Sequence, residues 1–128
     1  MNDREIPNDW TGNCFGCSRK NTQGLRLRFW LSEEGCFTKC TIPDHLCGLD
    51  GVVHGGIVTV LLEEVAAWMI TACLSRLGIT REISVRYLKP TRTNAELLVF
   101  VLVQLITIAI CIIEPQLILW LPGKMIAN

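Results

Sequence analysis

The residues best suited to chemistry lie in one short stretch, where a histidine and two glycines precede two carboxylates. His54 is followed by Gly55 and Gly56, and Glu63 and Glu64 come later in the same apolar run. Glycines at a helix start leave backbone N–H groups uncovered, and such groups bind an anion or an oxyanion. A carboxylate in an apolar helix is unfavourable unless it has a partner or a role. The combination predicts a site that polarises a carbonyl and supplies a base or nucleophile.

The spacing of these residues indicates how such a site is assembled. Gly56 and Glu63 share one side of the expected helix and lie about 10 Å apart along its axis, at about 1.5 Å per residue. A carbonyl-polarising donor and a base must both lie within about 3 Å of the reacting group. Two antiparallel helices in a dimer can meet this condition, with Gly56 of one copy facing Glu63 of the other. We therefore expect a composite site at a two-fold interface.

The two glutamates lie on different sides of the expected helix. Glu64 shares its side with Thr71 and Ser75, a thin polar stripe, whereas Glu63 shares its side with apolar residues and Gly56. We therefore expect Glu63 to be the more desolvated, with a pKa raised toward that of a useful base. The alternative is that both glutamates line a solvated edge of the helix.

His54 stands just before the helix, at a position typical of a cap. It either contacts an ester or thioester carbonyl or orders the turn through a hydrogen bond with the backbone, and the pattern favours the second. A histidine-dependent triad is not supported, because Ser75 and Ser84 lack the context of a nucleophile elbow.

Cys14 and Cys17 have the C-x-x-C spacing of metal and redox sites. No second pair of comparable spacing is present, so a zinc site needs another ligand from elsewhere in the chain. The candidates for that ligand are Cys36, Cys40, Cys47 and His45. A thioredoxin-like role fails because no strand precedes the pair and no helix clearly follows it. We expect both cysteines to pack around a tight turn, with no metal and no cofactor.

The elements that hold these residues follow from the apolar pattern. An irregular arm is expected over residues 1–23 and a loop over residues 43–54. Strands are expected over residues 25–31, 36–42, 81–88, 95–106 and 109–119. The helix is expected over residues 55–77, with Gly78 as its stop, and it should be buried on nearly every side. This order predicts an α+β fold in which an antiparallel sheet wraps around one long helix.

Length and composition restrict the class of protein. The 128 residues suffice for a single domain over residues 1–128. Twelve basic and twelve acidic residues cancel, and no basic stripe is present, which argues against a nucleic-acid partner. The hydrophobic fraction of 50% predicts an oligomer interface that covers the excess.

The cell compartment is predicted from the N-terminus and the cysteines. The opening residues are polar, without the apolar run of a signal peptide. Seven cysteines, an odd number, are expected to be mostly reduced thiols in a cytoplasmic protein. The apolar segment over residues 97–113 is short for a membrane span and lacks flanking positive clusters, so we expect buried strands there and no membrane partner.

Four motifs of the chain resemble one family when they are taken together. They are Cys14-Phe-Gly-Cys17 with Gly24-Leu-Arg-Leu-Arg-Phe29, then Gly51-Val-Val-His54-Gly55-Gly56, Leu61-Leu62-Glu63-Glu64 and Thr80-Arg-Glu-Ile-Ser-Val-Arg-Tyr87. Over residues 10–100 the chain resembles hotdog-fold acyl-CoA thioesterases of the phenylacetate-degradation and 4-hydroxybenzoyl-CoA thioesterase superfamily. The resemblance implies a homodimer or a dimer of dimers that hydrolyses an acyl-CoA.

The resemblance also implies roles for individual residues. Glu63 matches the catalytic carboxylate, Gly56 the N–H that polarises the thioester carbonyl, and His54 the histidine that positions it. Thr80 falls where a hydroxyl orients the attacking water. The other implied substrate-binding residues are Gly55, Glu64, Arg81, Arg86, Lys89 and Arg92, with the basic ones meeting the phosphates of coenzyme A.

The chain departs from the family pattern at several places. Glu63 replaces the aspartate usual in the closest subgroup, and Gly48 stands where some branches have a substrate-binding asparagine. Residues 104–108 make a poor turn, and the chain ends soon after Gly123, so a truncated final strand with an open sheet edge is expected.

Three other functions remain open at this point. One is a hotdog module that binds an acyl-CoA without hydrolysing it, and another is a dehydratase or hydratase on the same fold. The third is a structural zinc protein built on Cys14 and Cys17. The histidine followed by two glycines, with an acid nine residues on, favours the thioesterase.

Overall fold

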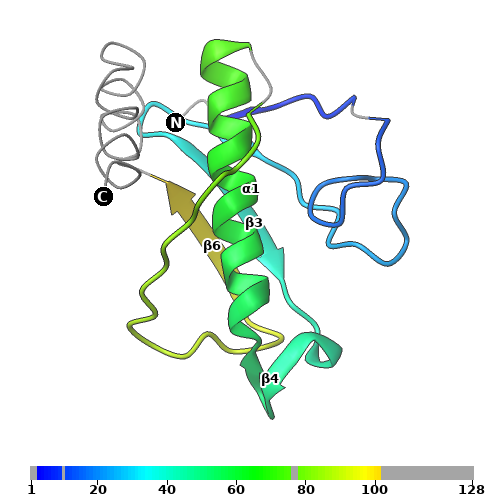
Figure 1. Cartoon of the computed structure of the whole chain (residues 1–128), viewed down its shortest axis with the longest axis vertical. Helices are drawn as coiled ribbons and strands as arrows, with labels where there is room; N and C mark the ends of the chain where they lie inside the picture. The colour runs from blue at the N-terminus through cyan, green and yellow to red at the C-terminus, as the bar shows by residue number, and fades with distance from the viewer. Residues whose placement is uncertain (1–2, 10, 76–77, 102–128) are drawn as a thin grey trace, which may run out of the picture.

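A computed structural model describes residues 3–9, 11–75 and 78–101. The elements in chain order are β1 (Arg4–Glu5), β2 (Trp30–Leu31), β3 (Cys36–Thr41), the 3₁₀ turn η1 (Asp44–Leu46), β4 (Cys47–Leu49), β5 (Val52–Val53), α1 (Gly55–Leu74) and β6 (Glu96–Val101). One sheet has the order β1-β2-β3-β6, and β4 pairs with β5 in a second; all pairs are antiparallel. Helix α1 lies across one face of the larger sheet (Figure 1). The α+β class, with one long helix on an antiparallel sheet, is confirmed.

The core lies between α1 and strands β3 and β6. The β3–β6 register runs from Cys36 opposite Val101 to Thr41 opposite Glu96. Phe29, just before β2, is buried and stacks on Trp68 of α1, with 5.1 Å between the ring centroids. Aromatic and aliphatic side chains from both layers therefore hold the helix over β3, which fixes where its carboxylates lie.

The helix begins at Gly55 as expected but ends at Leu74, three residues before the predicted end. Ser75 adopts the left-handed conformation, with φ of 52°, and its N–H donates to the carbonyl of Thr71. Gly78 is therefore not the stop, because the chain has already left the helix at Ser75.

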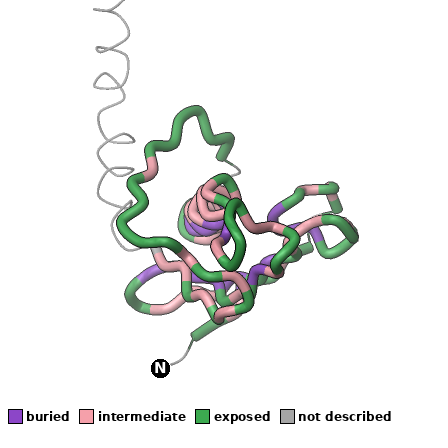
Figure 2. Tube along the Cα trace, turned by 90° about the horizontal axis from the view of Figure 1, so that it is seen from below, coloured by how far each residue is buried: buried purple, intermediate pink, exposed green. Residues whose placement is uncertain are grey.

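The expectation that the helix is buried on nearly every side is wrong. Its buried residues are Leu61, Glu64, Val65 and Met69, a single stripe. Figure 2 shows that much of the helix is only partly buried. The described sheet lies on one face only, so the rest of the apolar surface stays partly open. Helix α1 is long and apolar enough to cross a membrane. The core helix of a soluble protein can meet the same criteria of length and composition.

The first expected strand is mostly irregular. Only Trp30 and Leu31 pair as a strand, because Arg26 has a φ of 52° and the backbone of residues 25–27 is held by a loop instead. Leu25 and Leu27 donate their N–H groups to the carbonyls of Phe15 and Gly16. The side-chain alternation survives, since Leu27 and Phe29 are both buried.

Two short pairings lie where the sequence predicted none. Strand β1 is part of the expected irregular arm and pairs with β2. The β4–β5 hairpin lies within the expected loop, and its turn contains Gly51 at a φ of +74°. Both pairings are too short to produce a periodic signal in the sequence.

The expected strand over residues 81–88 is not part of the sheet. This segment runs back along α1 on the side away from the sheet (Figures 1 and 2), and Thr91 accepts the N–H of Val53 at its end. A strand needs a neighbour for its backbone groups, and among the described residues none bonds the backbone of residues 81–88. The strand expected over residues 109–119 and the end of the chain lie outside the described residues.

Candidate active site

The start of α1 is capped by the side chain of His54. Its Nδ1 accepts the N–H of Gly56 at 3.0 Å, and its carbonyl accepts the N–H groups of Ile57 and Val58 at 2.9 and 3.2 Å. This is the turn-ordering role that the residue pattern favoured. The Gly56 N–H, expected to polarise a carbonyl, is therefore engaged, and it becomes available only when the imidazole turns away.

The C-terminal end of the segment 81–88 contacts the start of α1 through Tyr87. The Tyr87 hydroxyl donates to the carbonyl of Gly55 at 2.9 Å and lies 2.6 Å from the Thr59 hydroxyl. A cavity of about 280 Å³ opens beside them, and Lys89 is among its lining residues. Arg81, Arg86 and Arg92 are exposed.

Glu63 and Thr80 are brought together, although they are 17 residues apart. The Thr80 hydroxyl donates to Oε1 of Glu63 at 2.6 Å. Glu63 also lines a cavity of about 680 Å³ whose wall includes Ala67, Trp68 and Ile79. A carboxylate with one oxygen held by a hydroxyl and a largely apolar cavity beside it has the arrangement of a general base.

The expectation that Glu63 is the more desolvated carboxylate is wrong in this chain. Glu64 is the buried one, with 7% of its surface exposed, while Glu63 is half-buried. Glu64 lies about one helical turn after Leu61, on the buried stripe of α1. Thr71, which suggested a solvated stripe, donates instead to the Ala67 carbonyl of its own helix.

Glu64 meets the cysteine pair of the N-terminal loop. The Cys14 thiol donates to Oε1 of Glu64 at 2.9 Å, and Cys17 is buried beside it. Burial raises the pKa of the Cys17 thiol well above its ordinary value, and the hydrogen bond to Glu64 raises it further. In the metal-free chain Cys17 is therefore a thiol at neutral pH. The tight turn expected around the pair is present over residues 15–17.

Sequence reasoning missed the contact between Glu64 and the cysteines. The two parts of this contact are 50 residues apart, and the partners considered for the pair were other cysteines and His45. The sequence did contain one signal for this contact. An acid in an apolar helix and a C-x-x-C pair without a second pair each lack a partner, so they could have been considered as partners of each other.

A comparison with family models supports the fold family. Residues 50–104 match the model described as the thioesterase superfamily, a range that includes the helix start, both glutamates and Thr80. One long helix on an antiparallel sheet is consistent with the hotdog fold of that superfamily, so match and fold together support a hotdog-fold thioesterase. Searches of curated proteins and of solved structures found no match. This match supports hydrolysis of a thioester in general.

Proposed function

We propose that the chain hydrolyses the thioester bond of an acyl-CoA, with Glu63 as the general base. The observation that carries the proposal is the bond of 2.6 Å between Thr80 and Glu63 at a cavity of about 680 Å³. The acyl group lies against the apolar wall of that cavity. Water attacks the carbonyl carbon while Glu63 takes its proton, and the C–S bond then breaks to release the acid and the thiol of coenzyme A.

The oxyanion donor in this proposal is the Gly56 N–H of a second copy. Glu63 lies about 10 Å along the axis from Gly56 of its own helix, too far for one substrate carbonyl. Four exposed apolar side chains on the post-helix segment support a dimer: Ile79, Ile83, Tyr87 and Leu88. The approach of the substrate carbonyl displaces the His54 imidazole from the Gly56 N–H.

Basic side chains on the post-helix segment bind the phosphates of coenzyme A in this proposal. Lys89 lines the cavity near the helix start, and Arg81 and Arg86 are exposed along the segment that leads to it. The six described cysteines are free thiols, which supports a reducing, cytoplasmic location.

The first test measures thiol release from short, long and aromatic acyl-CoA esters, after correction for the protein's own thiols. Glu63→Gln keeps the size of the side chain and removes the base, so kcat is expected to fall by about 10²- to 10⁴-fold. Thr80→Val is expected to cause a smaller fall, because the carboxylate remains. Unchanged hydrolysis of every ester by Glu63→Gln would overturn the proposal.

A second test asks whether two chains build one site. Gly56→Val blocks the approach to the N–H, and Glu63→Gln removes the base, so each homodimer is expected to be inactive. After mixing and re-association, a heterodimer has one site with both lesions and one intact site. Recovery of roughly a quarter of wild-type activity is expected for this two-fold symmetry. If the mixture stays inactive while heterodimers are present, both groups act within one chain.

A second candidate function is the binding of an acyl-CoA without hydrolysis. The bond between His54 and the Gly56 N–H favours it, because the donor needed for carbonyl polarisation is already engaged. It predicts saturable binding of the ester with no release of thiol by the wild-type chain.

A further inference from the structure

We propose that Cys14, Cys17 and Glu64 form a binding site for one divalent cation of the zinc type. One ligand atom from each residue, two sulfurs and a carboxylate oxygen, lies within 4.8 Å of the others. Ligand atoms around a tetrahedral zinc ion lie about 4 Å or less apart. Small side-chain rotations would therefore bring the three ligand atoms to the distances that zinc requires. Cys14 and Cys17 lie outside the range that matches the thioesterase superfamily, and none of the three ligands is the proposed general base or oxyanion donor.

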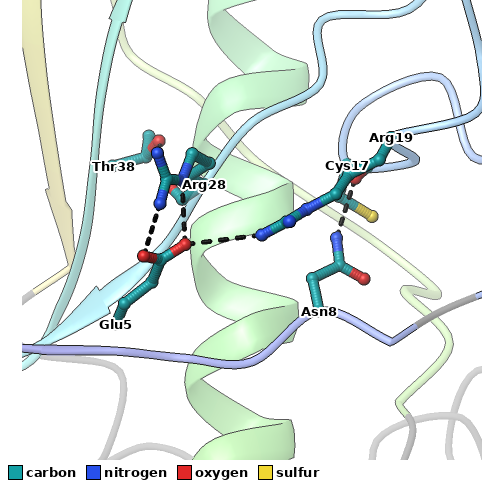
Figure 3. Close-up of polar contacts among 6 residues, drawn as sticks. All are labelled: Glu5, Asn8, Cys17, Arg19, Arg28 and Thr38. Atoms are coloured by element: carbon teal, nitrogen blue, oxygen red, sulfur yellow. Dashed lines mark hydrogen bonds and ion pairs between the residues drawn. The ribbon is translucent and has the colours of Figure 1, made fainter.

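The loop that carries the two cysteines is held against the helix. A Cβ atom at Gly16 would collide with the Glu64 carboxyl group, so a larger residue there would force the loop or the Glu64 side chain to shift. The amide of Asn8 donates to the Cys17 carbonyl at 2.8 Å, and Glu5 is paired with Arg28 and Arg19 nearby (Figure 3). The ligand atoms therefore belong to a loop that several bonds hold in place.

The charge of Glu64 supports a cation at this position. Its carboxylate is buried, and within the part of the chain that the structure describes no cationic side chain pairs with it. A buried carboxylate is unfavourable without a compensating positive charge. Two sulfurs beside it select a borderline or soft ion over magnesium or calcium, which take oxygen ligands.

The geometry leaves one coordination position open. Three protein ligands are fewer than the four of a closed structural zinc site. All three residues line the cavity of about 680 Å³ that Glu63 also lines, so water or a small sulfur or oxygen ligand can complete the coordination from that side. Binding displaces the thiol protons, and the affinity is therefore expected to rise with pH.

The test uses the full chain, reduced and freed of metal with a chelator under anaerobic conditions. Zn²⁺ or Co²⁺ is then added, and the metal that stays with the protein after gel filtration is counted by mass spectrometry. We expect one ion per chain, and for Co²⁺ a sulfur-to-metal charge-transfer band. Cys14→Ser, Cys17→Ser and Glu64→Gln should each weaken binding by at least about tenfold.

Matched controls separate a ligand role from a loss of fold and from the proposed hydrolysis. Glu63→Gln makes the same change one residue away and should keep the ion, as should Cys73→Ser at an exposed thiol. Glu64→His restores a zinc ligand and should recover binding, with circular dichroism reporting the fold of every variant. A wild-type chain without stoichiometric metal, or a Glu64→Gln chain that binds as tightly as wild type, overturns the site. Neither result changes the expected loss of hydrolysis in Glu63→Gln.

Discussion

At the scale of single residues, two adjacent glutamates of one helix differ in burial and in hydrogen-bond partner. Glu63 lies at a cavity and accepts a hydrogen bond from Thr80, whereas Glu64 is buried and accepts one from Cys14. Successive helix residues point about 100° apart, so one carboxylate faces the post-helix segment and the other the N-terminal loop. This separation places the two carboxylates in the two different sites proposed above.

The cap at His54 predicts an effect on stability that can be separated from catalysis. His54→Ala removes the acceptor of the Gly56 N–H and should lower the free energy of unfolding by about 1 kcal/mol. His54→Asn supplies another cap acceptor and should recover most of that loss. Urea denaturation of both variants measures the difference. Equal stabilities of the Ala and Asn variants would show that the ring does not act as a cap.

At the scale of elements, the end of α1 is under conformational strain that a glycine relieves. Ser75 holds the left-handed conformation with a φ of 52°, which is unfavourable for a residue with a Cβ atom. Ser75→Gly should therefore raise the free energy of unfolding by about 0.5–1 kcal/mol, visible as a higher melting temperature. Ser84→Gly, in the extended segment that follows, is the control and should not stabilise the chain. A Ser75→Gly chain that melts below wild type contradicts the expectation.

The contact between η1 and the turn that precedes β6 should make stability depend on pH. Thr93 and Asn94 donate to the Asp44 carboxylate, and these bonds lower its pKa below the ordinary aspartate value. Because the folded pKa is lower, the stability from these bonds is complete above the unfolded pKa of about 3.9 and is lost as pH falls through the folded value.

The measurement compares melting temperatures of wild type and Asp44→Asn at pH 7 and near pH 2. The difference between the two chains is expected to be larger at pH 7 and to shrink in acid, as the wild-type carboxyl group takes up a proton. Thr93→Val should show the same trend to a lesser degree. A difference that stays constant between the two pH values would mean that the charge on Asp44 adds nothing.

At the scale of the whole molecule, the described residues leave the face of α1 away from the sheet incompletely covered. The segment that crosses it exposes 98% of Ile79 and 84% of Leu88. Its backbone over residues 81–88 also has no partner among the described residues. Both features favour a second copy of the chain on this face, because a monomer leaves apolar surface and backbone groups in water.

Leu88→Glu tests this interface. Losing the burial of one leucine weakens association by about 1.5–3 kcal/mol, so the dimer dissociation constant should rise roughly ten- to hundredfold. Leu49→Glu in β4, where 73% of the leucine is exposed, is the control on another surface and should leave the dimer intact. Analytical ultracentrifugation over a range of concentrations measures both. A wild-type chain that sediments as a monomer, or equal effects of the two variants, rules out this face.

Local sequence patterns are enough to predict the start of α1 at Gly55, the pairing segments β3 and β6, the cap position of His54 and the fold class. These features depend on neighbours close in the chain: a glycine pair, an alternating run, or a run too apolar to be exposed. Local preferences therefore suffice to specify them.

The packing of the layers sets which side of the helix is buried and what each glutamate contacts, and local patterns do not predict either. Because α1 is apolar on nearly every side, its pattern does not indicate which face the sheet covers, and Glu64 rather than Glu63 lies on the buried stripe. The contacts of Glu64 with Cys14 and of Glu63 with Thr80 join residues 50 and 17 positions apart. Such contacts depend on how the layers pack, which no local preference specifies.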